Sequence, residues 1–146
     1  MNPARIVLVE DNPADVYLLK LALKENGIAH ELIHFATGED AVQALCNHDA
    51  VETPPPDMIL LDLNTPRSDG FQVLLRFRND PNFANVPIAI ITSSRASSDK
   101  FRSQLQGVRL IEKPSQLEDF LEAVGKAIQE MLLETGRMPV ATPQAP

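Results

Sequence analysis

Five side chains suited to phosphate chemistry stand at the ends of four separate apolar runs. Glu10 and Asp11 follow the first run, and Asp62 ends the second. Thr92 ends the third run, and Lys113 follows the fourth. Together they supply a carboxylate nucleophile, a hydroxyl donor and a cation. Because phosphoryl transfer depends mainly on positioning and on neutralising the equatorial oxygens, the pattern predicts that chemistry, with Asp62 as the reactive group.

Three of these side chains, Glu10, Asp11 and Asp62, are carboxylates that would repel one another if their strands were neighbours. A cation between them would relieve this repulsion. Mg²⁺ suits such a site because it is a hard ion that accepts oxygen ligands, keeps several waters and commonly meets phosphate oxygens. We therefore expect a Mg²⁺ site at this place.

Each residue also has a simpler interpretation when it is taken alone. An acidic pair after a strand often forms a turn or caps a helix, and Asp62 could be an ordinary loop residue. Thr92 is a common type of strand end, and Lys113 could be a solvated charge. Their joint placement at the carboxyl ends of four strands favours the chemical interpretation, because open α/β sheets bind ligands at that edge.

Short apolar runs alternate with segments of helical periodicity, and Asn12 and Thr37 are good helix caps. The pattern predicts a (βα)5 doubly wound α/β fold with a parallel five-stranded sheet, and we expect the flavodoxin-like strand order 2-1-3-4-5. The polar strand at 30–35 is expected at an edge. The expected strands are 5–9, 30–35, 57–62, 86–92 and 108–112, and the expected helices are 13–25, 37–46, 69–79, 97–105 and 117–132.

The length of 146 residues indicates one domain, and a hydrophobic content of 44% is ordinary for a globular protein. A net charge of −7 argues against a nucleic-acid binder that relies on general electrostatics. No apolar run approaches the roughly 20 residues of a membrane helix, and we expect no signal peptide. Cys46 has no second cysteine to pair with, which fits a cytoplasmic location, and its apolar helical setting predicts a buried structural thiol.

The ordered motifs resemble the receiver domain of two-component response regulators over residues 5–130. This resemblance implies that Asp62 accepts a phosphoryl group from a phosphohistidine on a sensor kinase. It also implies slow self-dephosphorylation, so that the protein is a signalling phosphoacceptor rather than an enzyme. The motifs are Val9-Glu10-Asp11-Asn12, Leu61-Asp62-Leu63-Asn64-Thr65-Pro66 with Asp69-Gly70, Ile91-Thr92-Ser93, and Lys113-Pro114.

The same resemblance implies roles for the other site residues. Glu10, Asp11 and Asp62, with the backbone carbonyl of Asn64, would hold Mg²⁺. The Thr92 hydroxyl would hydrogen-bond the bound phosphoryl group, and the Lys113 ammonium would pair with its oxygens. The peptide bond before Pro114 is expected to be cis.

Two alternative functions remain open. The family often has an aromatic switch residue three positions before the lysine, where this chain has Leu110. A pseudo-receiver, which binds proteins independently of phosphorylation, is therefore one alternative. The other is a phosphatase-type hydrolase, but such enzymes usually place a second acid two residues after the nucleophile, and Asn64 cannot act as that acid.

The segments 47–56 and 131–139 make the chain look like the small regulators that accompany cyanobacterial and bacterial phytochromes. This narrower resemblance implies a sensor histidine kinase partner such as a bacteriophytochrome. We expect residues 1–134 to form the receiver and residues 135–146 to form a flexible tail.

The narrower resemblance also implies a homodimer. Its contact would use the face formed by the helix at 97–105, the strand at 108–112 and the last helix. The alternative is one more helical turn packed on its own domain. The apolar residues expected to extend the dimer contact are Met131, Leu132, Leu133 and Met138.

Overall fold

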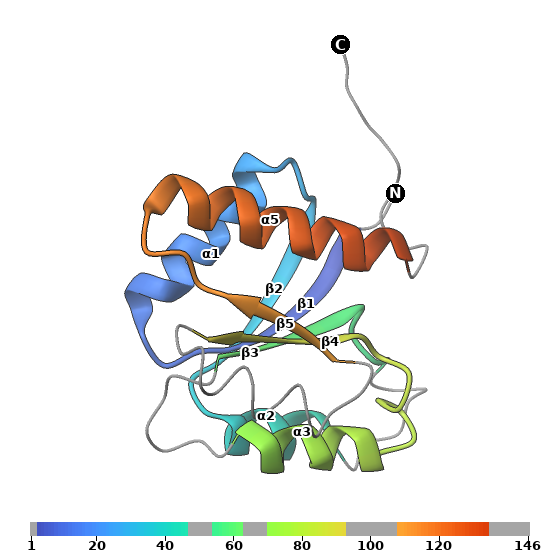
Figure 1. The fold of residues 1–146 in the computed structure, drawn as a ribbon. Helices are drawn as coiled ribbons and strands as arrows, with labels where there is room; N and C mark the ends of the chain where they lie inside the picture. Colours follow the sequence, from blue (N-terminus) through green and yellow to red (C-terminus); the bar gives the residue numbers. More distant parts are fainter. Residues whose placement is uncertain (1–2, 47–53, 63–69, 93–107, 135–146) are drawn as a thin grey trace.

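Five parallel strands form one sheet in the computed structural model of the chain (Figure 1). The structure describes residues 3–46, 54–62, 70–92 and 108–134. The strands are β1 (Ala4–Val9), β2 (His30–Phe35), β3 (Met58–Asp62), β4 (Ile88–Thr92) and β5 (Arg109–Glu112). The helices are α1 (Pro13–Glu25), α2 (Gly38–Leu45), α3 (Gly70–Asn79) and α5 (Leu117–Glu134).

The strand order is β2-β1-β3-β4-β5, and every neighbouring pair is parallel. The predicted fold class, the strand order and the edge position of β2 are therefore confirmed. β1 and β3 are neighbours, and the strand that follows β1 in the chain lies on the other side of β1. This arrangement is a topological switch point, and it brings Glu10 and Asp62 to adjacent strand ends.

Helices cover both faces of the sheet, with α1 and α5 on one side and α2 and α3 on the other (Figure 1). Along β1, Ile6 and Leu8 belong to the core beneath α1 and α5. Val7 and Val9 belong to the core beneath α2 and α3. Every residue of β3 and β4 is buried, which is why these two strands are almost continuously apolar in the sequence.

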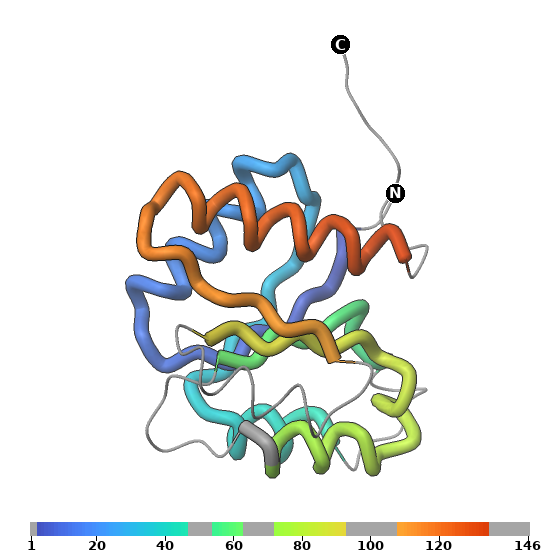
Figure 2. The backbone as a smooth tube through the Cα atoms, in the orientation of Figure 1, coloured from blue at the N-terminus to red at the C-terminus, as the bar shows by residue number. Residues whose placement is uncertain are grey.

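Helices α1 and α5 come from opposite ends of the chain and lie side by side (Figure 2). The side-chain amide of Asn26 donates to the carbonyls of Ala22, at 2.7 Å, and Leu121, at 3.0 Å. Gln129 donates back to the carbonyl of Asn26 at 3.2 Å. A Cβ on Gly125 would collide with Nδ2 of Asn26, so this close approach depends on the glycine.

Both predicted helix caps are confirmed. The side-chain oxygen of Asn12 accepts from the N–H of Ala14 at 2.9 Å. The hydroxyl of Thr37 accepts from the N–H of Asp40 at 3.1 Å. These bonds satisfy backbone donors that a helix leaves free at its first turn, so α1 and α2 begin where the sequence predicts.

Two of the four residues predicted to extend a dimer contact lie in the chain's own core. Met131 is 5% exposed and Leu132 is 0% exposed, in the cluster beneath α1 and α5. The prediction that they contact a partner is wrong, because the last turns of α5 complete this core. Leu133 is 48% exposed, and Met138 lies outside the described residues.

Some local expectations differ from the structure, and others lie outside the described residues. β4 begins at Ile88, because Pro87 has no N–H to donate to a strand ladder. The peptide bond before Pro114 is trans, the form that X–Pro bonds favour by about 0.5–1 kcal/mol, so the cis expectation is wrong. The helix expected at 97–105 and the tail at 135–146 lie in the part that is not described.

None of the helices in the described residues has both the length and the apolar character that a membrane span requires.

Candidate functional site

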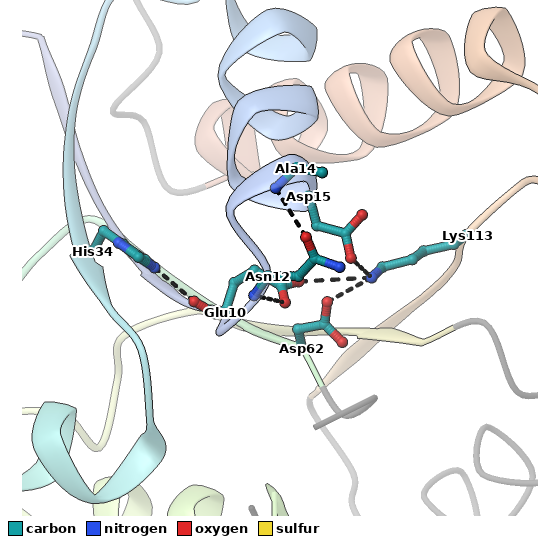
Figure 3. Close-up of polar contacts among 7 residues, drawn as sticks. All are labelled: Glu10, Asn12, Ala14, Asp15, His34, Asp62 and Lys113. Atoms are coloured by element: carbon teal, nitrogen blue, oxygen red, sulfur yellow. Dashed lines mark hydrogen bonds and ion pairs between the residues drawn. The ribbon is translucent and has the colours of Figure 1, made fainter. Parts of the chain in front are cut away.

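Four charged side chains meet at the carboxyl edge of the sheet (Figure 3). Nζ of Lys113 lies 2.5 Å from Oδ2 of Asp62 and 3.3 Å from Oδ2 of Asp15. It also lies 3.7 Å from Oε1 of Glu10. The side chains of Asp62, Glu10 and Lys113 are 1%, 5% and 12% exposed. Water therefore screens these charges weakly, and they interact more strongly than surface charges do.

Glu10 is held at the end of β1 by its neighbour strand and by its own turn. Its N–H donates to the carbonyl of Phe35 at 3.0 Å. Its Oε2 accepts from the N–H of Asn12 at 3.1 Å, and Asn12 in turn caps α1. The residues that end the strand and begin the helix therefore also orient this carboxylate.

Asp62 and Thr92 are the last residues of β3 and β4, and both are buried. Thr92 lies opposite Glu112 in the register of β4 and β5. The N–H of Lys113 donates to the carbonyl of Thr92 at 2.8 Å, which continues the ladder by one residue. The structure thus brings the predicted residues Asp62, Thr92 and Lys113 to one edge of the sheet.

Asp15 belongs to this cluster and was not predicted from the sequence. It lies in the first turn of α1, and its carboxylate can share an ion with those of Glu10 and Asp62, because one oxygen from each lies within 4.8 Å of the others. The available signal was an acid in the first turn of a helix that starts beside the predicted acidic pair. The rotation of α1 about its axis, which turns Asp15 toward Lys113, comes from packing.

The two other predicted metal ligands have different outcomes. Asp11 is exposed and is not among the three acids that the described residues bring together. Its role as a ligand stays a prediction. Asn64 lies outside the described residues.

The donor set fits a hard divalent cation. Three carboxylates, those of Glu10, Asp15 and Asp62, face the single ammonium of Lys113, so negative charge is in excess among these four groups. Carboxylate oxygens are the ligands that Mg²⁺ prefers, and an additional cation would offset the excess. This cluster is therefore a possible metal-binding site.

Leu110 occupies the position where the family often has an aromatic residue. It lies in β5, is partly buried and packs against the core beneath α2 and α3. An aliphatic side chain in this setting contributes packing but has no hydroxyl that could exchange hydrogen-bond partners.

Cys46 is buried at the end of α2, as the sequence predicts. Burial, with a smaller contribution from the charge of Asp80, raises the pKa of the Cys46 thiol to about 11. Because the thiolate is the reactive form of cysteine, this thiol is unreactive at neutral pH.

A parallel sheet of this strand order, with clustered acids and a lysine at its carboxyl edge, is the arrangement expected of a receiver domain. Comparison with known families gives the same result. The family model described as the response regulator receiver domain matches residues 6–125. The chain belongs to this family.

Individual relatives are similar along nearly the whole chain. Response regulator Rcp1 of Synechocystis sp. (strain ATCC 27184 / PCC 6803 / Kazusa) is 35% identical over 143 residues, covering 96% of this chain and 97% of that protein. The crystal structure of a phosphorylated cyanobacterial phytochrome response regulator, RcpA, has a TM-score of 0.74 and 33% identity, covering 94% and 99% of the two chains. The Mn²⁺-bound form of Rcp1 has a TM-score of 0.68 and 30% identity, covering 98% and 100%.

Proposed function

We propose that this receiver accepts a phosphoryl group on Asp62 from a phosphohistidine of a sensor histidine kinase, in a reaction that requires Mg²⁺. The observation that carries the proposal is the contact of 2.5 Å between Nζ of Lys113 and Oδ2 of Asp62, at a buried strand end beside two further acids. A carboxylate in this position lies beside a cation that can pair with the negative oxygens of an incoming phosphoryl group.

The reaction would exchange one bond to phosphorus for another. A carboxylate oxygen of Asp62 attacks the phosphorus of the phosphohistidine, and the P–N bond breaks with its electron pair passing to the imidazole. Lys113 pairs with the phosphoryl oxygens, and the hydroxyl of Thr92 donates a hydrogen bond to one of them. Support comes from Lys113, which already lies beside Asp62, and from the place of Thr92 at the end of the neighbouring strand β4.

The metal would be held by Glu10, Asp11, Asp62 and the backbone carbonyl of Asn64. Asp15 lies close to Glu10 and Asp62 and adds a further carboxylate beside the site. Bound there, Mg²⁺ would neutralise charge on the transferred group. The Mn²⁺-bound state of the relative Rcp1 supports a divalent cation in this family.

The partner and the response are further parts of the proposal. Relatives described as phytochrome response regulators support a phytochrome-type histidine kinase as the phosphodonor. A cytoplasmic location, which the single cysteine Cys46 fits, is also part of the proposal. The signal would pass on by a conformational change or by formation of a homodimer. Because Met131 and Leu132 are buried, such a dimer would use other residues. Leu133 is exposed and is available for such a contact.

Intact mass after incubation with acetyl phosphate and Mg²⁺ tests the phosphoacceptor role. Wild type and Asp119→Asn, which changes an exposed acid in the first turn of α5, should gain one phosphoryl group. Asp62→Ala and wild type in EDTA should gain none. Transfer from a phosphorylated histidine kinase then tests the donor class.

The pseudo-receiver remains the second candidate, because Leu110 replaces the usual aromatic switch. It predicts neither phosphoryl gain nor Mg²⁺ binding by wild type. Mg²⁺ binding without a gain in mass would instead indicate that acetyl phosphate is not a donor. Transfer from the phosphorylated kinase would then distinguish a phosphoacceptor from a pseudo-receiver.

A further inference from the structure

The ring of His34 contacts the backbone of a predicted metal ligand. Nε2 of His34, on β2, lies 2.6 Å from the carbonyl oxygen of Glu10 (Figure 3). A carbonyl can only accept, so Nε2 carries the proton and donates it. Neither the motifs nor the predicted chemistry involves this histidine.

Two hydrogen bonds hold the backbone of Glu10, one on each side of its Cα. The N–H of Glu10 already donates to the carbonyl of Phe35 at 3.0 Å, and the ring of His34 binds the Glu10 carbonyl. β2 ends at Phe35, and the chain then turns to the cap of α2 at Thr37. A side chain, rather than a further ladder bond, therefore anchors the carbonyl of Glu10 where β1 leaves the sheet.

We propose that His34 is a positioning residue that fixes the turn at Glu10 and thereby aims its carboxylate at the metal site. Anchoring the carbonyl restricts rotation of the backbone at the point where the side chain departs toward Lys113. The same turn carries the N–H of Asn12 that binds Oε2 of Glu10 at 3.1 Å. This inference rests on the proposed function, since it assumes that Glu10 helps to bind a divalent cation.

The chain offers a matched control on the same strand. The ring of His30 also contacts a backbone carbonyl, with Nδ1 lying 2.8 Å from the carbonyl oxygen of Ile28. His30 pairs with Ala4 and His34 pairs with Leu8, so His30 stands at the opposite end of β2 from the site. His30→Leu therefore removes a similar ring–carbonyl bond without touching Glu10.

The test is Mn²⁺ binding, measured from the EPR signal of the free ion at one fixed pH, on wild type, His34→Leu, His34→Gln and His30→Leu. His34→Leu should bind Mn²⁺ about tenfold more weakly, the lower end of what outer-shell partners contribute. His30→Leu should match wild type. His34→Gln keeps an N–H donor and should recover most of the affinity.

Urea unfolding in EDTA separates positioning from folding. His34→Leu and His30→Leu should lose similar stability there, whereas only His34→Leu should lose Mn²⁺ affinity. If wild type binds Mn²⁺ and His34→Leu binds it equally well, or if both leucine variants lose affinity alike, the role of His34 is overturned. If wild type does not bind Mn²⁺, the metal site of the proposed function fails, and this role fails with it.

Discussion

The ammonium of Lys113 and the carboxylate of Asp62 lie 2.5 Å apart although 51 positions separate the two residues in the chain. One follows β5 and the other ends β3, so β4 lies between their strands in the sheet. The long side chain of Lys113 spans this distance along the carboxyl edge. Within the described ranges, this ammonium is the positive charge that the carboxylates of Glu10, Asp15 and Asp62 share.

Replacing Lys113 by Met should destabilise the protein in EDTA. The change leaves the carboxylates of Glu10 and Asp62 buried without the ammonium, and removing one partner of a buried ion pair costs about 3 kcal/mol of unfolding free energy or more. Saturating Mg²⁺ should reduce this loss because it supplies positive charge at the same place. Urea unfolding with and without Mg²⁺ measures both effects. Lys126→Met, at an exposed position of α5, is the control, and equal stability of the two variants in EDTA would contradict the prediction.

Replacing Asp15 by Asn should weaken Mg²⁺ binding. The carboxylate lies among those of Glu10 and Asp62, and removing one charge at this separation costs about 1 kcal/mol, or roughly fivefold in affinity. Isothermal titration calorimetry with Mg²⁺ measures the change. Asp119→Asn, an exposed acid in the first turn of α5, should leave the affinity unchanged. An unaltered affinity in Asp15→Asn would mean that Asp15 serves Lys113 alone.

Stability should fall above pH 9 because of Cys46. Its thiol has a pKa of about 11 when folded, raised by burial from 9.0, so the unfolded chain loses its proton first as the pH rises. This contribution is fully present below pH 9 and is lost as the pH rises toward 11. Between pH 7.5 and 9.5 the expected loss is about 0.8 kcal/mol of unfolding free energy. Urea unfolding at both values should show this additional loss in wild type relative to Cys46→Val, and parallel pH dependences would refute it.

Replacing Gly125 by Ala should destabilise the packing of α1 on α5, despite the better helix propensity of alanine. The new Cβ collides with Nδ2 of Asn26 and breaks its bonds to the carbonyls of Ala22 and Leu121. Two lost hydrogen bonds of about 1 kcal/mol each outweigh a propensity gain of about 1 kcal/mol. Thermal unfolding should therefore show a net loss.

The same substitution in an Asn26→Ala background provides the control. With the colliding amide removed, Gly125→Ala should cost at least about 1 kcal/mol less than it does in wild type. A cost that is equal in both backgrounds would show that Asn26 is not its cause.

Much of the fold could be predicted because its signals lie within single elements. The strands β3 and β4 are buried on both faces and appear as apolar runs, while Asn12 and Thr37 mark helix starts through local bonds. The alternation of strand and helix then predicts a parallel sheet, and the order 2-1-3-4-5, which makes β1 and β3 neighbours, is one of the common doubly wound orders.

The sequence by itself determined which residue types stand at the strand ends, and so Asp62, Glu10, Thr92 and Lys113 could be named in advance. Only the tertiary structure decided that Asp15 joins them, that His34 binds the carbonyl of Glu10, and that Met131 and Leu132 belong to the core. Periodicity within an element shows that a face is apolar but not what covers that face. The rotation of each helix and the contacts between distant segments are set by packing, which no local pattern encodes.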